Sequence, residues 1–301
     1  MPEEEYGELR QKIDTVVHTA ALVKHYGDSQ EFQRINILGV QNILQFSKNK
    51  SLFHISTTSI AGDYAKQGQE NLYFNEDSLD IGQNLGGNCY VESKFEAEKI
   101  ISRHIQDGFK ATIIRVGNLT GRQTDGVFQI NIRDNKFYQI LKSIIEISKI
   151  PKSWAKKDLE FTPVDLCSRA IVKLLQVEES SGKTFHLLNH NFIKINNVTK
   201  ILLEMGYKVD IVSDNSFYKY LQDRLSHINN FDTLLGLVPD LQKGKLNYNT
   251  SAVTVDFRFT IAALRQLDFE WAPIDEAYIK KVFAYMRLVG FVKKLPQELL
   301  N

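Results

Sequence analysis

The feature that most constrains the fold of this chain is a regular alternation of short buried strands and amphipathic helices in its first half. Segments 13–20, 52–56 and 111–116 are short, apolar and rich in β-branched residues, which is typical of strands buried on both faces. Segments 30–47 and 90–105 lie between them and carry apolar residues at near-helical spacing. Strands separated by helices indicate right-handed crossovers. The pattern therefore predicts an α/β fold, a doubly wound parallel sheet with helices on both faces.

The pattern of the sequence changes towards the C-terminal end of the chain. Before residue 190 it predicts helices at 137–147 and 164–175 and strands at 159–161 and 184–188. Beyond residue 195 helical patterns dominate, at 196–205, 215–225 and 275–288, with one strand at 208–212. We therefore predict a Rossmann-like core over residues 1–190 and a smaller, mostly helical lobe over residues 191–301.

Composition excludes several classes of protein. Of the 301 residues, 43% are hydrophobic and 24% are charged, which argues against disorder and against a fibrous repeat. The net charge of +1 gives no basic excess, so nucleic acid is not an expected partner. No apolar run approaches the roughly 20 residues of a membrane-spanning helix, and the acidic N-terminus is not a signal peptide. The two cysteines lack metal-ligand spacing, so we expect a cytoplasmic protein with no metal site.

The residues that directly follow each predicted strand are the first place to look for a site. In doubly wound sheets, ligands bind beyond the carboxyl ends of the strands. The segments at these positions are Ala20-Ala21-Leu22-Val23, Thr57-Thr58-Ser59-Ile60-Ala61-Gly62 and Gly117-Asn118-Leu119-Thr120-Gly121. Hydroxyl and amide side chains are therefore predicted to gather at one edge of the sheet.

A tyrosine and a lysine stand four residues apart, as Tyr90 and Lys94, at the start of a predicted helix. Such a pair shares one face of a helix, and a nearby cation lowers the pKa of a phenol. Tyr90 could then give a proton to a carbonyl oxygen that receives hydride. Thr57, at the preceding strand end, could hold the same oxygen.

Three other features have simpler interpretations. A second pair with the same spacing, Tyr138 and Lys142, follows no hydroxyl-rich strand end and is interpreted as helix surface and core. His18 and His54 lie in strands and are interpreted as core groups rather than ligands. A basic stretch is either a solvated face or a docking surface for an acidic partner or a phosphate group. That stretch contains Lys142, Lys149, Lys152, Lys156 and Lys157.

Several motifs, taken in order, resemble those of one family. They are Val16-Val17-His18-Thr19-Ala20-Ala21, Asn36 with Gly39, Ser56-Thr57-Thr58-Ser59, Tyr90-x-x-x-Lys94, Arg115-Val116-Gly117-Asn118, the segment from Gly121 to Phe137, Phe161-Thr162-Pro163-Val164-Asp165 and Phe185-His186-Leu187-Leu188-Asn189. Together they resemble extended short-chain dehydrogenase/reductases, and within these the terminal thioester reductase domains of nonribosomal peptide synthetases. The resemblance covers nearly the whole chain.

The resemblance implies a site and a reaction. Thr57, Tyr90 and Lys94 would be the catalytic triad, and Lys94 would also bind the nicotinamide ribose. Ala20, Ala21 and Val23 would pass under the cofactor, while Gly117 and Asn118 would lie beside the nicotinamide. The implied cofactor is NADPH, and the implied partner is an acyl or peptidyl carrier protein with a phosphopantetheine-linked thioester. The product would be an aldehyde, or an alcohol after a second hydride transfer.

One departure from the family is large. The family sheet begins with a strand, a Gly-x-x-Gly-x-x-Gly turn and a helix that holds the pyrophosphate, and this sequence contains no such turn. About three strand–helix units, on the order of 100 residues at ~30 per unit, are expected to be missing. The chain is therefore expected to be an excised fragment or a naturally truncated protein that is catalytically silent on its own. Its exposed sheet edge is expected either to self-associate or to be covered by another segment. The alternatives are a sugar-nucleotide epimerase or dehydratase of the same superfamily, and a non-catalytic substrate- or carrier-binding half.

Overall fold

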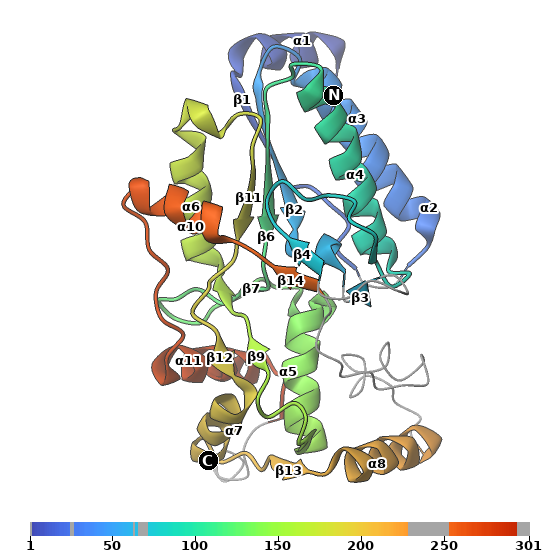
Figure 1. Ribbon diagram of the computed structural model, residues 1–301, viewed down its shortest axis with the longest axis vertical. Helices are drawn as coiled ribbons and strands as arrows, with labels where there is room; N and C mark the ends of the chain where they lie inside the picture. Colours follow the sequence, from blue (N-terminus) through green and yellow to red (C-terminus); the bar gives the residue numbers. More distant parts are fainter. Residues whose placement is uncertain (1, 25–26, 63, 66–71, 228–252, 294–301) are drawn as a thin grey trace. The chain divides into compact units, whose positions relative to one another are not determined.

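Four parallel strands form the central sheet, in the order β1-β2-β6-β11, in a computed structural model that describes residues 2–24, 27–62, 64–65, 72–227 and 253–293 (Figure 1). The strands are β1 (Thr15–His18), β2 (Ser51–Thr57), β6 (Ala111–Val116) and β11 (Thr184–Leu187). Each joins the next through helical segments, which confirms the predicted α/β fold with a doubly wound parallel sheet.

Helices lie on both sides of this sheet, with α3 and α4 on one side and α6 and α10 on the other (Figure 1). The helical segments around it are α1 (Glu3–Lys12), α2 (Ser29–Phe32), η1 (Gln33–Leu38), α3 (Gly39–Phe46), η2 (Thr58–Ala61), α4 (Cys89–Gln106), α6 (Val164–Leu175), η4 (Glu178–Ser180) and α10 (Arg258–Gln266). The short strands β3 (Tyr64–Ala65) and β5 (Gln83–Asn84) pair with each other, as do β4 (Leu72–Phe74) and β14 (Val253–Val255).

The face of the sheet below α3 and α4 is closed by aliphatic side chains. This cluster contains Val40, Leu44, Leu52, Ala97, Ile101, Ala111 and Ile113, all at most 4% exposed. Burying each larger side chain contributes roughly 1.5–3 kcal/mol, so this layer fixes α4 against the sheet. Apolar residues whose spacing predicted the helices α3 and α4 are the ones that pack against the sheet.

A second body of the chain consists of helices and short strand pairs. Its helical segments are η3 (Ile132–Asp134), α5 (Lys136–Ile147), α7 (Ile195–Glu204), α8 (Asp214–His227) and α11 (Glu276–Leu288). Its strand pairs are β7 (Leu119–Thr120) with β10 (Thr162–Pro163), β9 (Asp158–Leu159) with β12 (Ile193–Lys194), and β8 (Lys149–Pro151) with β13 (Asp210–Val212). Side chains of α5, α7 and α11 share one buried core.

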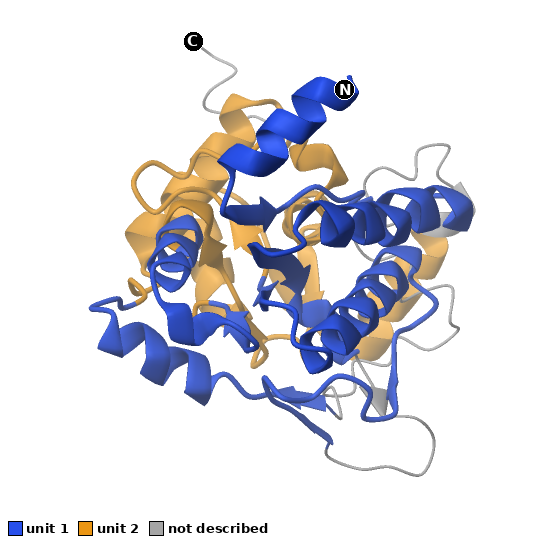
Figure 2. Ribbon diagram, turned by 90° about the horizontal axis from the view of Figure 1, so that it is seen from above, with its two compact units in different colours: residues 1–117, 167–188, 251–270 blue, residues 118–166, 189–250, 271–301 orange. Residues whose placement is uncertain are grey.

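The chain divides into two compact units, and neither is continuous in sequence (Figure 2). Unit 1 contains residues 1–117, 167–188 and 251–270, and unit 2 contains residues 118–166, 189–250 and 271–301. This division differs from the sequence-based boundary at residue 190. The reason is pairing between distant segments: β14 pairs with β4 and α10 contacts β11, so residues 251–270 belong to unit 1.

Candidate active site

The helix that carries Tyr90 and Lys94, α4, is capped at its N-terminus by the side chain of Asn88. The Asn88 side-chain oxygen accepts hydrogen bonds from the amides of Tyr90 and Val91, at 3.0 and 3.2 Å. Asparagine is among the best residues for satisfying these otherwise unpaired helix amides. The cap fixes the first turn of α4, so Tyr90 lies in that turn and Lys94 lies one turn later.

Thr57 and Tyr90 are brought together by the structure. Thr57 ends β2, where its hydroxyl accepts the amide N–H of Ser59 at 3.1 Å. The hydroxyls of Thr57 and Tyr90 also share a hydrogen bond. The next hydroxyl along, that of Thr58, donates instead to the carbonyl of Val116 at 3.3 Å. Of the two adjacent threonines, Thr57 is therefore the one that faces the phenol.

The expected effect of Lys94 on Tyr90 is not what the structure shows. Burial raises the pKa of Tyr90 to about 12, and the hydrogen bond with Thr57 opposes that rise only in part. The Lys94 ammonium, 4% exposed, donates to the carbonyl oxygen of Ile55 at 2.8 Å. Desolvation of the phenolate is the largest effect on the pKa of Tyr90, and the lowering that the spacing suggested does not occur.

Lys94 itself is shifted by its surroundings. Burial lowers its pKa from 10.5 to about 8, and the negative charge of Glu98 acts in the opposite direction. At neutral pH the ammonium is still mostly charged. A buried cation with this reduced pKa is the sort of group found at functional sites.

The loop after β1 is held against α4 by a residue whose role the sequence did not reveal. Asn36 accepts the amide N–H of Leu22 at 2.7 Å and donates to the Leu22 carbonyl at 3.0 Å. It also donates at 2.8 Å to the hydroxyl of Ser93, which in turn donates to the Tyr90 carbonyl at 2.8 Å. The surrounding η1 segment is a π-helix, a local widening that often marks functional sites.

The three predicted loop contacts flank this clamp. Ala20 and Val23 are exposed and Ala21 is half-buried, next to the clamped Leu22. These residues lie beyond the carboxyl end of β1, where ligands of such sheets bind.

Gly117 and Asn118 fall in different units. The Gly117 amide donates to the Leu187 carbonyl at 3.0 Å within unit 1. Asn118 begins unit 2, where its amide donates to the Glu160 carboxyl at 2.5 Å and its carbonyl accepts from Thr162 at 2.9 Å. Burial raises the pKa of Glu160 to about 7, against hydrogen bonds from Thr162 and Asn118. The sequence did not indicate Glu160, because its contact is with the Asn118 amide, 42 residues earlier in the chain, and no local pattern marks such a contact.

The remaining sequence candidates are structural groups. His18 and His54 lie opposite each other in β1 and β2, and their Nδ1 atoms are 3.1 Å apart, so each is a hydrogen-bonding partner of the other. Tyr138 is fully buried, and its hydroxyl accepts the Gly121 amide at 2.8 Å. Within the described ranges, no group of three or more His, Cys, Asp or Glu side chains could hold a metal ion. None of the described helices is long and apolar enough to cross a membrane.

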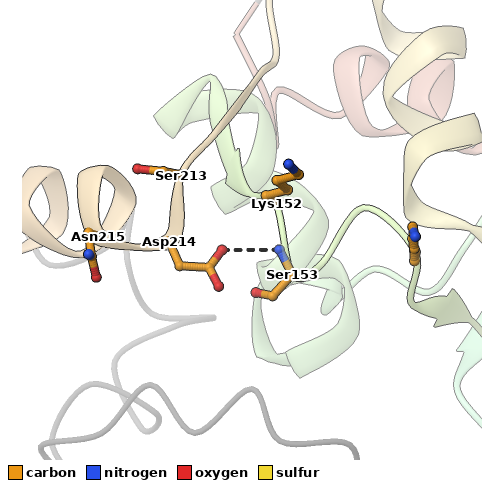
Figure 3. Close-up of a pocket in the computed structure, with 6 residues that line it drawn as sticks. Lys152, Ser153, Ser213, Asp214 and Asn215 are labelled. Carbon is orange, nitrogen blue, oxygen red and sulfur yellow. Dashed lines mark hydrogen bonds between the residues drawn. The ribbon is translucent and has the colours of Figure 1, made fainter.

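Part of the basic stretch borders a pocket in unit 2. The pocket has a volume of about 470 Å³ and is lined by Lys152, Ser153, Lys156, Ser213, Asp214 and Asn215. The Asp214 carboxylate accepts the Ser153 amide at 3.0 Å, which joins the start of α8 to the turn after β8 (Figure 3). Lys152 and Lys156 thus line a pocket whose one carboxylate, that of Asp214, is hydrogen-bonded to the protein backbone.

Comparison with known proteins identifies relatives along the whole chain. The model of a NAD-binding family described as "Male sterility protein" matches residues 1–171, more than half of the chain. A linear gramicidin synthase polypeptide of Brevibacillus parabrevis is 26% identical over 291 residues, which cover 95% of this chain and 6% of that protein. L-2-aminoadipate reductase of Saccharomyces cerevisiae is 24% identical over 289 residues, which cover 91% of this chain and 20% of that one. The chain thus spans a small part of these relatives.

Solved structures agree with the sequence relatives. A thiolation-reductase di-domain of an archaeal nonribosomal peptide synthetase has a TM-score of 0.83 and 28% identity, covering 96% of this chain and 61% of that one. The terminal R domain of the myxalamid pathway has a TM-score of 0.82 and 25% identity, covering 98% and 73%. UDP-glucuronic acid 4-epimerase of Bacillus cereus has a TM-score of 0.59 at 16% identity, covering 94% of this chain and 77% of that one, and so shares the fold alone.

Proposed function

The chain belongs to the NAD-binding family of male sterility proteins and is related to the terminal reductase domains of nonribosomal peptide synthetases, and on that premise we propose that it is the catalytic part of a thioester reductase. The substrate is an acyl or peptidyl thioester on the phosphopantetheine arm of a carrier protein, and the product is an aldehyde. A second reduction of the aldehyde gives an alcohol. The observation that carries the proposal is the hydrogen bond between Thr57 and Tyr90, with buried Lys94 one helical turn away.

The chain's own residues suit the nicotinamide end of the cofactor. Ala20, Ala21 and Val23 present backbone at the end of β1, and the Lys94 ammonium uses one of its three protons on the Ile55 carbonyl, which leaves donors for ribose hydroxyls. The bound cofactor, NADPH in this proposal, supplies the hydride. Asn118 and Gly117 complete the set that the family resemblance assigns to the nicotinamide.

Tyr90 acts as the proton donor and Thr57 as the group that holds the carbonyl oxygen. When the carbonyl carbon receives hydride, the oxygen takes the proton of Tyr90, and a thiohemiacetal forms. Because its pKa is about 12, Tyr90 keeps that proton at neutral pH until charge develops on the oxygen. The carbon–sulfur bond then breaks, the hydroxyl proton passes to sulfur, and aldehyde and phosphopantetheine thiol leave.

Lys94 assists as a buried cation. Its charge stabilises the Tyr90 phenolate left after proton transfer, since a low-dielectric site strengthens such an interaction. Because the pKa of Lys94 is about 8, the side chain is mostly charged at neutral pH. Activity should therefore fall as the pH rises above about 8 and Lys94 loses its proton.

Exchange of Tyr90 tests the assignment. In a reductase in which a glycine-rich strand, turn and helix precede this chain, Tyr90→Phe should lower turnover by about 10²-fold or more, because a positioned proton donor typically contributes 10²–10⁴. Tyr73→Phe is the matched control, since Tyr73 is 70% exposed. Equal turnover by the Tyr90 and Tyr73 variants would refute the assignment. Tyr138 is unsuitable as a control, because its hydroxyl holds the Gly121 amide.

The carrier protein is the proposed partner, and the pocket beside Lys152 and Lys156 in unit 2 is its proposed docking place. Carrier proteins of this class are expected to be acidic, so opposite charge supports the pairing. Exchanging both lysines for glutamate should raise the KM for a carrier-bound thioester and leave the KM for a free pantetheine thioester unchanged. The same exchange at Lys12, exposed on α1, is the control. An equal rise for both substrates would contradict docking at this pocket.

Two alternatives are separated by simple assays. An epimerase or dehydratase of the superfamily would turn over a nucleotide sugar and ignore a carrier-bound thioester. A non-catalytic binding half would bind the carrier protein but show no saturable binding of NADPH, even with a glycine-rich segment present. Thioester-dependent oxidation of NADPH excludes both.

A further inference from the structure

The catalytic helix carries a third polar side chain on the face of Tyr90 and Lys94. Tyr90, Lys94 and Glu98 recur every fourth residue of α4, and residues four apart share a helix face. Glu98 is completely buried and Lys94 is 4% exposed. A carboxylate this deep in a protein requires a partner, because an unpaired buried charge is costly.

That partner is Arg115 of β6. The Arg115 side chain is 2% exposed and donates bidentate hydrogen bonds to the Glu98 carboxylate. Its Nε lies 3.2 and 3.0 Å from the two carboxylate oxygens, and its Nη2 lies 2.8 Å from one of them. Arg115 lies opposite Ser56 in the sheet, next to Thr57. The same ion pair therefore ties the helix that carries Lys94 to the strands beside Thr57.

The rest of the Arg115 side chain is also fully engaged within unit 1. Nη1 lies 3.0 Å from Nε2 of His186, whose Nδ1 lies 2.7 Å from the carbonyl of Asp256. Nδ1 must donate to that carbonyl, so Nε2 is the acceptor for Arg115. Burial, reinforced by the charge of Arg115, lowers the pKa of His186 to about 3, so the ring adds no charge. The Cζ atom of Arg115 lies over the Phe74 ring, 4.7 Å from the ring centroid.

The groups that act on Lys94 divide into neutral and charged ones. His18 of β1 and His54 of β2 are neutral, because burial lowers the pKa of His18 to about 4 and that of His54 well below its usual value, with Lys94 adding to both shifts. Tyr90 keeps its proton. Among the described residues that act on Lys94, Glu98 is the one that supplies a negative charge, and Arg115 offsets it.

We propose that Glu98 and Arg115 are positioning residues of this active site. Their ion pair holds α4, and with it Lys94, against the sheet, and it sets how strongly the positive charge of Lys94 is stabilised. The inference rests on the proposed function of Tyr90 and Lys94. Glu98 favours the ammonium, whereas Arg115 limits that help by binding the same carboxylate. The two residues therefore act on Lys94 with opposite sign, although they form a single ion pair.

This opposition distinguishes an electrostatic role from a purely structural one. Glu98→Gln removes the negative charge and leaves Arg115 unpaired, so the pKa of Lys94 should fall below about 8. Arg115→Met removes the cation that is paired with the Glu98 carboxylate, so the attraction of Glu98 for Lys94 is no longer offset and the pKa of Lys94 should rise. If the pair only held the fold together, both exchanges would shift the pKa of Lys94 in the same direction, or neither would.

The experiment follows the titration of Lys94 in the 301-residue chain, with lysine labelled by ¹³C at Cε and the Lys94 signal assigned through its loss in Lys94→Met. We expect a midpoint near pH 8 for the wild type, about one pH unit lower in Glu98→Gln and about one unit higher in Arg115→Met. Glu96→Gln is the control, since Glu96 is an exposed residue on the same helix and pairs with Lys99. Shifts of equal sign in the two single variants would overturn the proposal.

A double variant keeps the test available if a single variant does not fold. Replacing a complete buried ion pair by neutral groups is often tolerated, whereas removing one partner is not. In Glu98→Gln with Arg115→Met the midpoint should lie within about half a pH unit of the wild type, because two opposed effects are removed together. A larger shift would overturn the proposal. The titration needs neither NADPH nor thioester, so its failure is distinguishable from failure of the proposed reaction.

Discussion

Replacing Lys94 by methionine should stabilise the folded chain at neutral pH while abolishing the proposed reaction. Burial lowers the pKa of Lys94 from 10.5 to about 8, which corresponds to about 3 kcal/mol of lost stability wherever lysine is charged in both states. Methionine has a similar length and no charge to desolvate. It also loses the hydrogen bond to the Ile55 carbonyl, a cost of about 1–2 kcal/mol. The net expectation at pH 7 is a gain of about 1–2 kcal/mol.

The sign of the effect must change with pH. Between pH 8 and 10.5 the unfolded chain keeps the Lys94 proton and the folded chain has lost it, so wild-type stability rises with pH. At pH 10.5 most of the desolvation penalty is gone and only the missing hydrogen bond separates the two proteins. Lys94→Met should then be about 1 kcal/mol less stable than the wild type.

Urea unfolding at pH 7 and at pH 10.5, followed by circular dichroism, measures both differences. Lys99→Met is the matched control, because Lys99 lies on the same helix but is partly exposed and paired with Glu96. Its stability should differ from the wild type by at most about 0.5 kcal/mol at either pH. A Lys94 variant that is destabilised equally at both pH values would refute the reasoning.

Three further predictions concern other parts of the chain. Asn36→Ala should cost about 1–3 kcal/mol in urea unfolding, because the Leu22 amide loses its partner, and it should weaken nicotinamide binding; unchanged values of both would contradict the clamp. Stability should fall by up to about 3 kcal/mol as pH rises from 4.5 through 7, since folded Glu160 keeps a proton that the unfolded chain releases, and Glu160→Gln should remove this slope. Val17→Lys, on terminal strand β1 of the described sheet, should reduce self-association in sedimentation; an unchanged monomer fraction would contradict association through that edge.

The local features of the fold could be predicted from the sequence because each rests on short-range periodicity. Alternating strands and helices indicated the parallel sheet, and the spacing of Tyr90 and Lys94 indicated their common helix face. Asn88, directly before Cys89, is a recognisable cap and fixes where that face begins. Such patterns depend on neighbours within about one helical turn, and tertiary contacts did not alter them here.

Several properties of the candidate site were decided only by the tertiary structure. The pKa of Tyr90 is raised rather than lowered, because burial depends on every element packed around a group and not on the residue four positions away. The Glu98–Arg115 pair and the Asn36 clamp join residues that are distant in sequence and carry no local signature. The two units are discontinuous because β14 pairs with β4, a contact between segments far apart in the chain. Sequence periodicity records which side of an element is buried, whereas the partner it is buried against is set by the packing of the whole chain.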